Sequence, residues 1–169
     1  ITSCNENKLN KENNQPNQTI ENKKAKTIKE EPKEDVINSD IENNYGLIDV
    51  KSLNQHLFVD LKYTTEDNFM HQILYKKIKK AYLQKEVAIR LSKCQDYLST
   101  IDTNLHLLIY DALRPLSVQQ EMWDALDTIP VNERTKFVSN PKNGSIHNYG
   151  SAVDLTICYA NRTPLDMGA

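Results

Sequence analysis

The sequence predicts an α+β fold in which helices flank a small antiparallel sheet. Segments with the two-residue period of a strand alternate with segments that carry the apolar stripe of a helix. These segments follow one another in mixed order, without a repeating strand–helix unit. Because a doubly wound parallel sheet needs that repeat, an antiparallel sheet fits the order of elements better.

Composition divides the 169 residues into two segments. Residues 5–44 contain ten Asn, seven Lys and nine acidic side chains, with no aromatic residue and no glycine. All eight Tyr, the three Phe and the one Trp follow this segment. A stretch this polar buries too little apolar surface to offset its ordering entropy. We therefore expect residues 1–44 to be a disordered polar tether and residues 45–169 to be the folded domain.

The first strand and the first helix are expected in the first half of the domain. In residues 57–63 (LFVDLKY) the side chains alternate with a period of two, which indicates a half-buried strand. Residues 85–98 contain apolar side chains four, three and four residues apart, which predicts an amphipathic helix that covers the sheet. The members of this stripe are Val87, Leu91, Cys94 and Leu98.

A second strand, a second helix and a last strand complete the predicted order. Residues 105–110 (LHLLIY) indicate the strand, and Ser117 with Gln120 three residues later has the capping-box pattern of a helix through residue 126. Residues 128–146, which hold two prolines, are expected to be mostly loop. In residues 152–159 (AVDLTICY) the side chain of Asp154 points away from the apolar face of the strand.

His147 and Asp154 are the strongest candidates for chemistry from spacing alone. Fully extended, the chain would hold them about 23 Å apart, so the side chains meet only if the backbone reverses between them. Gly150 lies where that reversal would fall. An imidazole and a carboxylate brought together supply part of a catalytic zinc site, which usually has three protein ligands and one position for water. The same pair could equally form a structural hydrogen bond.

Three short motifs, in order, resemble one family. Residues 145–156 (SIHNYGSAVDLT) fit S-x-H-x-x-G-x-A-x-D-L-T, which resembles the zinc-binding motif of the VanX-like D-alanyl-D-alanine dipeptidases, a group of zinc D,D-peptidases. Residues 58–69 (FVDLKYTTEDNF) resemble that group's D-L-[KR]-Y-A-T-x-x-N-F signature, with a threonine in place of Ala. Residues 109–115 (IYDALRP) resemble the segment that carries its essential arginine. The likeness runs from residue 45 to residue 169 and excludes the tether.

This resemblance implies the zinc D,D-peptidase (hedgehog/DD-peptidase-like) fold and a set of roles. His147 and Asp154 become two of the three ligands of one Zn²⁺ per chain. Arg114 becomes the cation that stabilises the oxyanion when metal-activated water attacks the scissile carbonyl, a role that suits a planar guanidinium. On its own, Arg114 would be read as a surface cation before a proline.

Three further roles follow from the same resemblance. Ser145 and Tyr63 would line the small substrate pocket, and Asp111 would orient the arginine through a carboxylate–guanidinium bond. From the residues alone, Ser145 and Tyr63 fit ordinary loop and strand-end packing equally well.

Part of the family's machinery is not visible in the sequence. The general base and the third ligand are expected in an E-x-x-H motif downstream of the aspartate, but no Glu or His follows Asp154. We therefore expect the sequence to be cut short at its C-terminus, with both residues beyond Ala169. An inactive homologue is the alternative.

The N-terminal residues ITSC resemble the end of a bacterial lipoprotein signal, the lipobox. In this interpretation Cys4 is acylated, and the protein faces the periplasm in the bacterial cell envelope; otherwise Cys4 is a free thiol and the protein is cytoplasmic. Cys94 and Cys158 lack metal-type spacing and are expected to be buried thiols, with a disulfide between them left open. A net charge of −2 gives no reason to expect nucleic acid, and no apolar run is long enough to cross a bilayer.

Together these observations predict zinc-dependent hydrolysis of the dipeptide D-Ala-D-Ala in cell-wall precursor metabolism. The expected partners are this small dipeptide and, through the lipid anchor only, the membrane. Two alternatives are a non-catalytic, lipid-anchored homologue that binds wall peptides and a zinc D,D- or L,D-carboxypeptidase that acts on muropeptides. The motifs at residues 58–69 and 109–115 argue against the carboxypeptidase.

Overall fold

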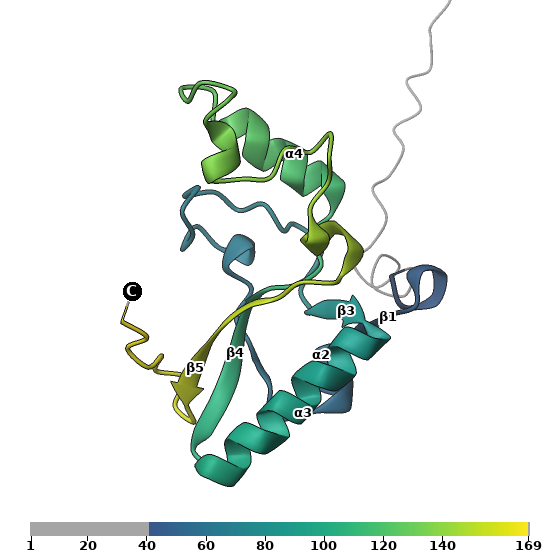
Figure 1. The fold of residues 1–169 in the computed structure, drawn as a ribbon, viewed down its shortest axis with the longest axis vertical. Helices are drawn as coiled ribbons and strands as arrows, with labels where there is room; N and C mark the ends of the chain where they lie inside the picture. Colours follow the sequence, from purple (N-terminus) through teal and green to yellow (C-terminus); the bar gives the residue numbers. More distant parts are fainter. Residues whose placement is uncertain (1–40, 169) are drawn as a thin grey trace, which may run out of the picture. The chain divides into compact units, whose positions relative to one another are not determined.

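The computed structural model describes residues 41–168, and it confirms the α+β class (Figure 1). Within this part a two-stranded and a three-stranded sheet are packed with helices. The strands are β1 (Leu47–Asp49), β2 (Phe58–Val59), β3 (Tyr82–Gln84), β4 (Leu105–Asp111) and β5 (Asp154–Tyr159). The helices are α2 (Val50–Leu53), α3 (Lys85–Ile101) and α4 (Leu116–Ala125). No helix of the described part is long and apolar enough to cross a membrane.

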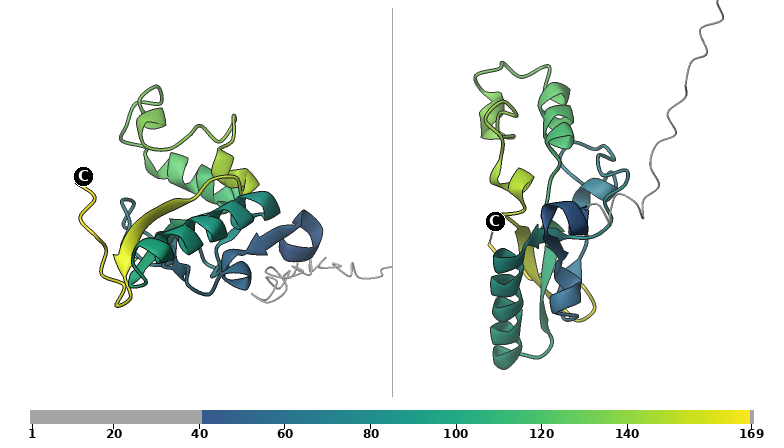
Figure 2. Two further views of the ribbon diagram at one scale, coloured as in Figure 1. Left: turned by 60° about the horizontal axis from the view of Figure 1, so that its bottom comes forward. Right: turned by 90° about the vertical axis from the view of Figure 1, so that its right-hand side faces the viewer.

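β4 is the centre of the three-stranded sheet. β5 pairs with it in antiparallel orientation, and β2 adds a short parallel pairing on the other side. β1 and β3 form a separate antiparallel pair. The small antiparallel sheet is therefore confirmed, with one parallel edge that the sequence did not predict. Helix α3 lies alongside β4 and also packs on β1, α2 and β3 (Figures 1 and 2).

The strand predicted over residues 57–63 is shorter than expected. Leu57, Leu61 and Tyr63 are buried as the alternation predicted, but the regular pairing covers Phe58–Val59 only. The chain then enters a 3₁₀ turn, Lys62–Thr64, in which the Thr64 N–H donates to the carbonyl of Leu61 (3.0 Å). The predicted burial of these three side chains was therefore correct, but a 3₁₀ turn takes the place of the second half of the predicted strand.

The helix predicted over residues 85–98 is confirmed as α3, but its buried stripe is different. The buried side chains are Ala88, Leu91, Gln95 and Leu98. Cys94 is exposed, so the prediction of a buried thiol is wrong there and correct for Cys158. Both thiols are free, so no disulfide joins them.

Helix α4 is also confirmed, but the predicted capping box is wrong. The helix begins at Leu116 with Pro115 in the N-cap position, and no side chain caps it. Ser117 therefore lies inside the first turn instead of preceding it. The helix turns Gln119, together with Val118 and Met122, toward the interior.

Ordered structure includes residues that composition had assigned to the tether. Residues 41–45 are helical, and Ile41 packs in the hydrophobic core. Glu42 accepts hydrogen bonds from the Tyr82 hydroxyl (3.2 Å) and from Lys80 Nζ (3.3 Å). Cys4 and the rest of the tether lie outside the described residues.

Candidate metal centre and active site

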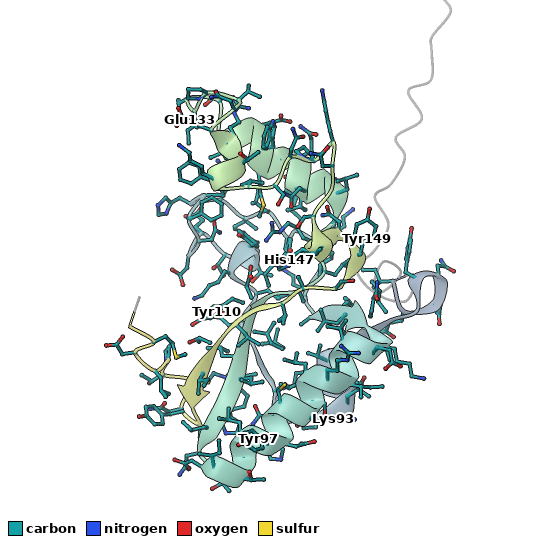
Figure 3. All side chains as sticks on the ribbon, in the orientation of Figure 1. Lys93, Tyr97, Tyr110, Glu133, His147 and Tyr149 are labelled. Atoms are coloured by element: carbon teal, nitrogen blue, oxygen red, sulfur yellow. The ribbon has the colours of Figure 1, made fainter. Side chains whose placement is uncertain are left out.

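The site forms where β4 ends beside the start of β5. Ile109 pairs with Leu155, but Asp111 pairs with Asp154, so β4 carries one extra residue, Tyr110, at this point. Such a bulge re-aims the side chains that follow it. Asp111 and Asp154 thereby emerge at the same end of the sheet. Figure 3 places His147 beyond this end of β4.

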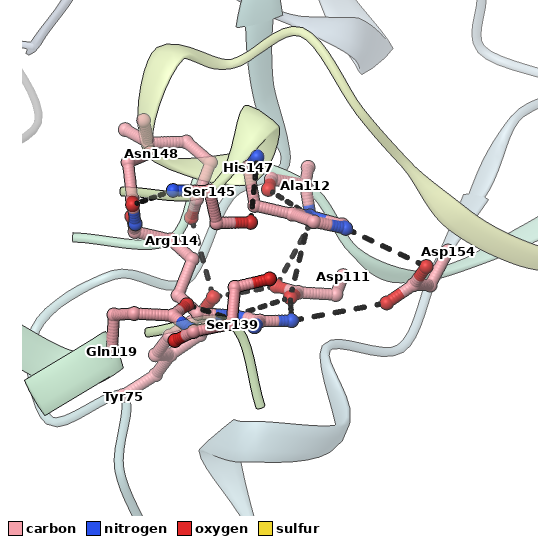
Figure 4. A network of polar contacts seen from close by, with 11 residues as sticks. Tyr75, Asp111, Ala112, Arg114, Gln119, Ser139, Ser145, His147, Asn148 and Asp154 are labelled. Atoms are coloured by element: carbon pink, nitrogen blue, oxygen red, sulfur yellow. Dashed lines mark hydrogen bonds and ion pairs between the residues drawn. The ribbon is translucent and has the colours of Figure 1, made fainter. Parts of the chain in front are cut away.

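A 3₁₀ turn, Ile146–Tyr149, carries His147. Ser145 closes a capping box in which its hydroxyl accepts from the His147 N–H (3.3 Å) and its N–H donates to Asn148 Oδ1 (2.6 Å). Two further bonds tie this turn to Arg114. The Arg114 N–H donates to the carbonyl of His147 (3.0 Å), and Asn148 Nδ2 donates to the carbonyl of Arg114 (2.7 Å). The backbones of His147 and Arg114 are thus held against each other (Figure 4).

Gly150 provides the reversal that the spacing required. It ends the turn with φ +63°, in the left-handed region that favours glycine. A Cβ at this position would lie 3.0 Å from Leu47 Cδ2 and 3.3 Å from the backbone N of Gln84. After the reversal, His147 Nε2 and Asp154 Oδ1 are 3.6 Å apart.

This close approach makes Gly150→Ala destabilising. We expect a loss of about 2–5 kcal/mol in the free energy of unfolding, from about 1–2 for the left-handed backbone and about 1–3 for overpacking. Gly144→Ala is the matched control, because Gly144 has φ +72° but its nearest neighbour would be 3.7 Å from a Cβ. Urea denaturation of the two variants measures the difference. Equal destabilisation would show that the contact with β1 and β3 contributes nothing.

The ring of His147 is oriented by the backbone of Ala112. His147 Nδ1 lies 2.9 Å from the carbonyl oxygen of Ala112. A carbonyl can only accept, so Nδ1 carries the hydrogen and the lone pair of the neutral ring is on Nε2. Metal-ligating histidines are commonly held by such a bond from the other ring nitrogen. The lone pair therefore faces Asp154.

The pair fits Zn²⁺ by its geometry and by its chemistry. Two ligand atoms about 2.0–2.2 Å from a tetrahedral zinc lie about 3.4 Å from each other, close to the separation observed here. The side chain of His147 is 12% exposed, whereas that of Asp154 is 57% exposed. The imidazole is thus fixed from inside, and the carboxylate borders solvent.

Asp111 lies near this pair but is not placed to bind a metal with it. Ligand atoms of Asp111, His147 and Asp154 all lie within 4.8 Å of one another. However, Asp111 Oδ2 approaches Nδ1 of His147 (3.6 Å), the nitrogen that already donates to Ala112. Both oxygens of Asp111 also accept hydrogen bonds from other groups. We therefore regard Asp111 as an anchor, which leaves His147 and Asp154 as the two candidate metal ligands of this cluster.

Arg114 is the group that Asp111 anchors. Asp111 Oδ2 accepts from Nε (3.0 Å) and Nη2 (2.5 Å) of Arg114, and the guanidinium is almost completely buried. Its Nη2 lies 3.9 Å from Asp154 Oδ2, and its Cζ lies 5.3 Å from the ring centroid of Tyr63. A fixed cation therefore borders the proposed metal ligand (Figure 4).

The charges of this cluster shift its protonation equilibria. Burial by itself would lower the pKa of His147, but Asp154, the Ala112 carbonyl and the charge of Asp111 raise it above its ordinary value. The contact with His147 holds the pKa of Asp154 below its ordinary value, and the charge of Arg114 contributes to this. Burial by itself would lower the pKa of Arg114, but the charge of Asp111 and its hydrogen bonds outweigh this and raise the pKa above its ordinary value. The arginine therefore stays charged.

The structure brings most of the predicted residues together. Arg114, Asp111, His147 and Asp154 form one network, and the ring of Tyr63 lies beside Arg114. Ser145 is adjacent, with its hydroxyl used in the turn that carries His147.

Sequence reasoning missed two residues that hold this network. The hydroxyl of Tyr75 donates to Asp111 Oδ1 (2.5 Å), and Gln119 Oε1 accepts from Arg114 Nη1 (3.1 Å). For Gln119 a signal existed, since it is a polar residue between Val118 and Met122 on the inner face of a helix. Tyr75 belongs to a stretch without periodicity, and nothing in the sequence points to it.

The α+β architecture agrees with the zinc D,D-peptidase fold that the sequence resemblance implied. Residues 43–169 match the sequence profile of the Peptidase M15 family, described as D-Ala-D-Ala dipeptidase, and the chain belongs to this family. It is 31% identical over 123 residues to the D-alanyl-D-alanine dipeptidase of Escherichia coli (strain K12). That match covers 73% of this chain and 59% of the relative.

Proposed function

We propose that the protein is a zinc-dependent dipeptidase that hydrolyses D-Ala-D-Ala in cell-wall precursor metabolism. One observation carries the proposal. His147 Nε2 lies 3.6 Å from Asp154 Oδ1, and a buried guanidinium held by Asp111 lies next to that carboxylate. Membership of the D-Ala-D-Ala dipeptidase family, and the name of the Escherichia coli relative, point to the dipeptide as substrate.

His147 and Asp154 would hold the metal. Zinc bound there would supply a Lewis acid that polarises the scissile carbonyl and makes water a stronger nucleophile at neutral pH. A third ligand and a general base are still needed, and the resemblance to the family assigns both to an E-x-x-H motif. Within residues 41–168, the one group of three candidate ligands contains Asp111, which is already committed to Arg114.

Arg114 would stabilise the negative charge that develops on the carbonyl oxygen. Its guanidinium is held by Asp111 before any substrate arrives, so little reorganisation is needed during the reaction. The guanidinium itself is almost completely buried, which strengthens its interaction with a developing charge. An interaction that is stronger in the transition state than in the substrate complex raises kcat.

Tyr63 and Ser145 would border the dipeptide. The buried ring of Tyr63 lies against Arg114 and would form an apolar wall beside the dipeptide. The hydroxyl of Ser145 accepts from the His147 N–H, which leaves its own hydrogen for donation to a substrate oxygen. Both roles are part of the proposal.

A comparison of two substrates tests the proposed function. We expect the full-length, zinc-loaded protein to release D-alanine from free D-Ala-D-Ala, to leave a pentapeptide stem that ends in D-Ala-D-Ala intact, and to lose activity with EDTA. Preferential cleavage of the stem would identify a carboxypeptidase instead. Binding of wall peptides without hydrolysis of either substrate would identify a non-catalytic homologue.

Attachment to the bacterial envelope through a lipid on Cys4 stays a prediction from the sequence. Cys4 lies outside the described residues, and only the lipobox-like ITSC supports the proposal. Labelled palmitate should be incorporated into the wild type and not into Cys4→Ala. Equal labelling of both would reject the anchor.

A further inference from the structure

We propose that Gln119 is a positioning residue that fixes the end of the Arg114 guanidinium that Asp111 leaves free. The inference rests on the proposed function, because it assigns to Gln119 a part in transition-state stabilisation by Arg114. It concerns a residue of α4, which supplies none of the predicted site residues.

Gln119 is a buried polar residue whose amide is hydrogen-bonded at both ends. Its side chain is completely buried on the inner face of α4. Burial of an amide is unfavourable unless both ends are hydrogen-bonded. Here Oε1 accepts from Arg114 Nη1 (3.1 Å), and Nε2 donates to the carbonyl of Ser139 (2.7 Å). Because the Ser139 carbonyl only accepts, the amide oxygen has to face the arginine.

Asp111 and Gln119 hold the guanidinium at different ends. Asp111 Oδ2 accepts hydrogen bonds from Nε and Nη2, and Gln119 Oε1 accepts one from Nη1. Of the five N–H groups of Arg114, the two left over are one on each terminal nitrogen. The carboxylate alone would let the far end of the group pivot. With Gln119 in place, the remaining N–H groups keep one direction relative to Asp154, which lies 3.9 Å from Nη2.

Gln119 also connects the arginine to a distant loop. Ser139 belongs to the irregular stretch between α4 and the turn that carries His147. The bonds from Ser139 through Gln119 to Arg114 therefore hold α4, this loop and the end of β4 in one arrangement (Figure 4). A shift of about 1 Å in a catalytic group is enough to lower a rate about 10²-fold, so such support has kinetic consequences.

Two substitutions of Gln119 distinguish the effect of its hydrogen-bond acceptor from the effect of its packing. Gln119→Met keeps the length of the side chain and removes the acceptor for Arg114, whereas Gln119→Glu keeps this acceptor; both lose the donor to the Ser139 carbonyl. Gln95→Met is the matched control. Gln95 is also completely buried and fully bonded, since it accepts from the Leu107 N–H (2.7 Å) and donates to the Leu105 carbonyl (3.1 Å), but it supports α3 and β4 away from the site.

In the full-length, zinc-loaded protein, we expect Gln119→Met to lower kcat about tenfold with KM within about twofold. Gln119→Glu should stay within about threefold of the wild-type kcat. Gln95→Met should lower the melting temperature and keep the wild-type kcat. A kcat loss in Gln119→Met no larger than in Gln95→Met, or an equal loss in both Gln119 variants, would overturn the proposal.

A second readout does not depend on the reaction. If the wild type fails to hydrolyse D-Ala-D-Ala, the proposed function is wrong, and NMR of the Arg114 side chain still tests the role of Gln119. Because the guanidinium is held at both ends, its Nη1 and Nη2 groups should give separate, slowly exchanging signals. Gln119→Met should collapse them, and Gln95→Met should not. Unchanged signals in Gln119→Met would overturn the positioning role.

Discussion

Replacement of Arg114 by alanine is expected to lower kcat about 10²-fold or more while KM changes little. The guanidinium is already fixed by Asp111 beside the proposed metal ligand Asp154, so its main contribution is to the charge that appears in the transition state. Steady-state release of D-alanine from D-Ala-D-Ala by the full-length, zinc-loaded protein measures both constants.

Two controls make this result specific. Arg114→Lys keeps the charge but loses the planar fork that Asp111 grips at two nitrogens, so we expect most of the loss to remain. Arg90→Ala removes an exposed arginine of α3, a helix that carries none of the site residues, and should keep kcat. A loss confined to KM in Arg114→Ala would mean that the arginine only holds the substrate.

Removal of either proposed zinc ligand should have the second large effect. We expect His147→Ala and Asp154→Ala each to lower the zinc content after dialysis from about one ion per chain to a small fraction of that. Activity should fall together with the zinc content, because the one remaining candidate ligand and the third ligand expected in the E-x-x-H motif do not hold the metal by themselves. Zinc analysis of the dialysed full-length protein gives the measurement.

His56→Ala is the control for these ligand variants. It removes an exposed imidazole at the other end of β4, where the backbone carbonyl of His56 lies 2.9 Å from Nδ1 of His106. The variant should keep both zinc and activity. Stoichiometric zinc in His147→Ala or Asp154→Ala would show that the ligands are misassigned. Asp111 would then be the next candidate, because it is the third member of the acidic and histidine cluster.

The parts of the site that could be predicted are those that the chain builds locally. His147 and Asp154 meet because the capped turn that carries His147 ends at a left-handed glycine, Gly150, four residues before Asp154. Asp111 and Arg114 are three residues apart just after a strand, so their ion pair is also short-range. The approach of His147 to Asp154 followed from residue types and spacing, whereas the Asp111–Arg114 pair was predicted from the resemblance to the family.

Long-range contacts were not predictable in the same way. Tyr75 reaches Asp111 from a stretch of turns, 36 residues away in sequence. Gln119 was hidden for a different reason. The predicted helix already contained Gln119, but a polar residue within a helix does not by itself indicate that it is buried or that Arg114 is its partner.

The buried stripe of α3 shows why apolarity alone misplaced a helix face. The sequence pattern favoured Cys94 as the more apolar side chain, yet Gln95 is the buried residue. Its amide is fully bonded to the backbone of β4, which removes the penalty for burying it. This compensation depends on a strand that lies ten residues or more along the chain, and a helical period cannot reveal it.

Location of the metal by anomalous scattering at the zinc edge tests the central claim most directly. In crystals of the full-length protein grown with zinc, we predict a peak about 2.0–2.2 Å from His147 Nε2 and from one oxygen of Asp154. Asp111 should remain bound to Arg114 in the same crystals. A peak on Asp111 or on His147 Nδ1, or no peak within bonding distance of His147, would contradict the account.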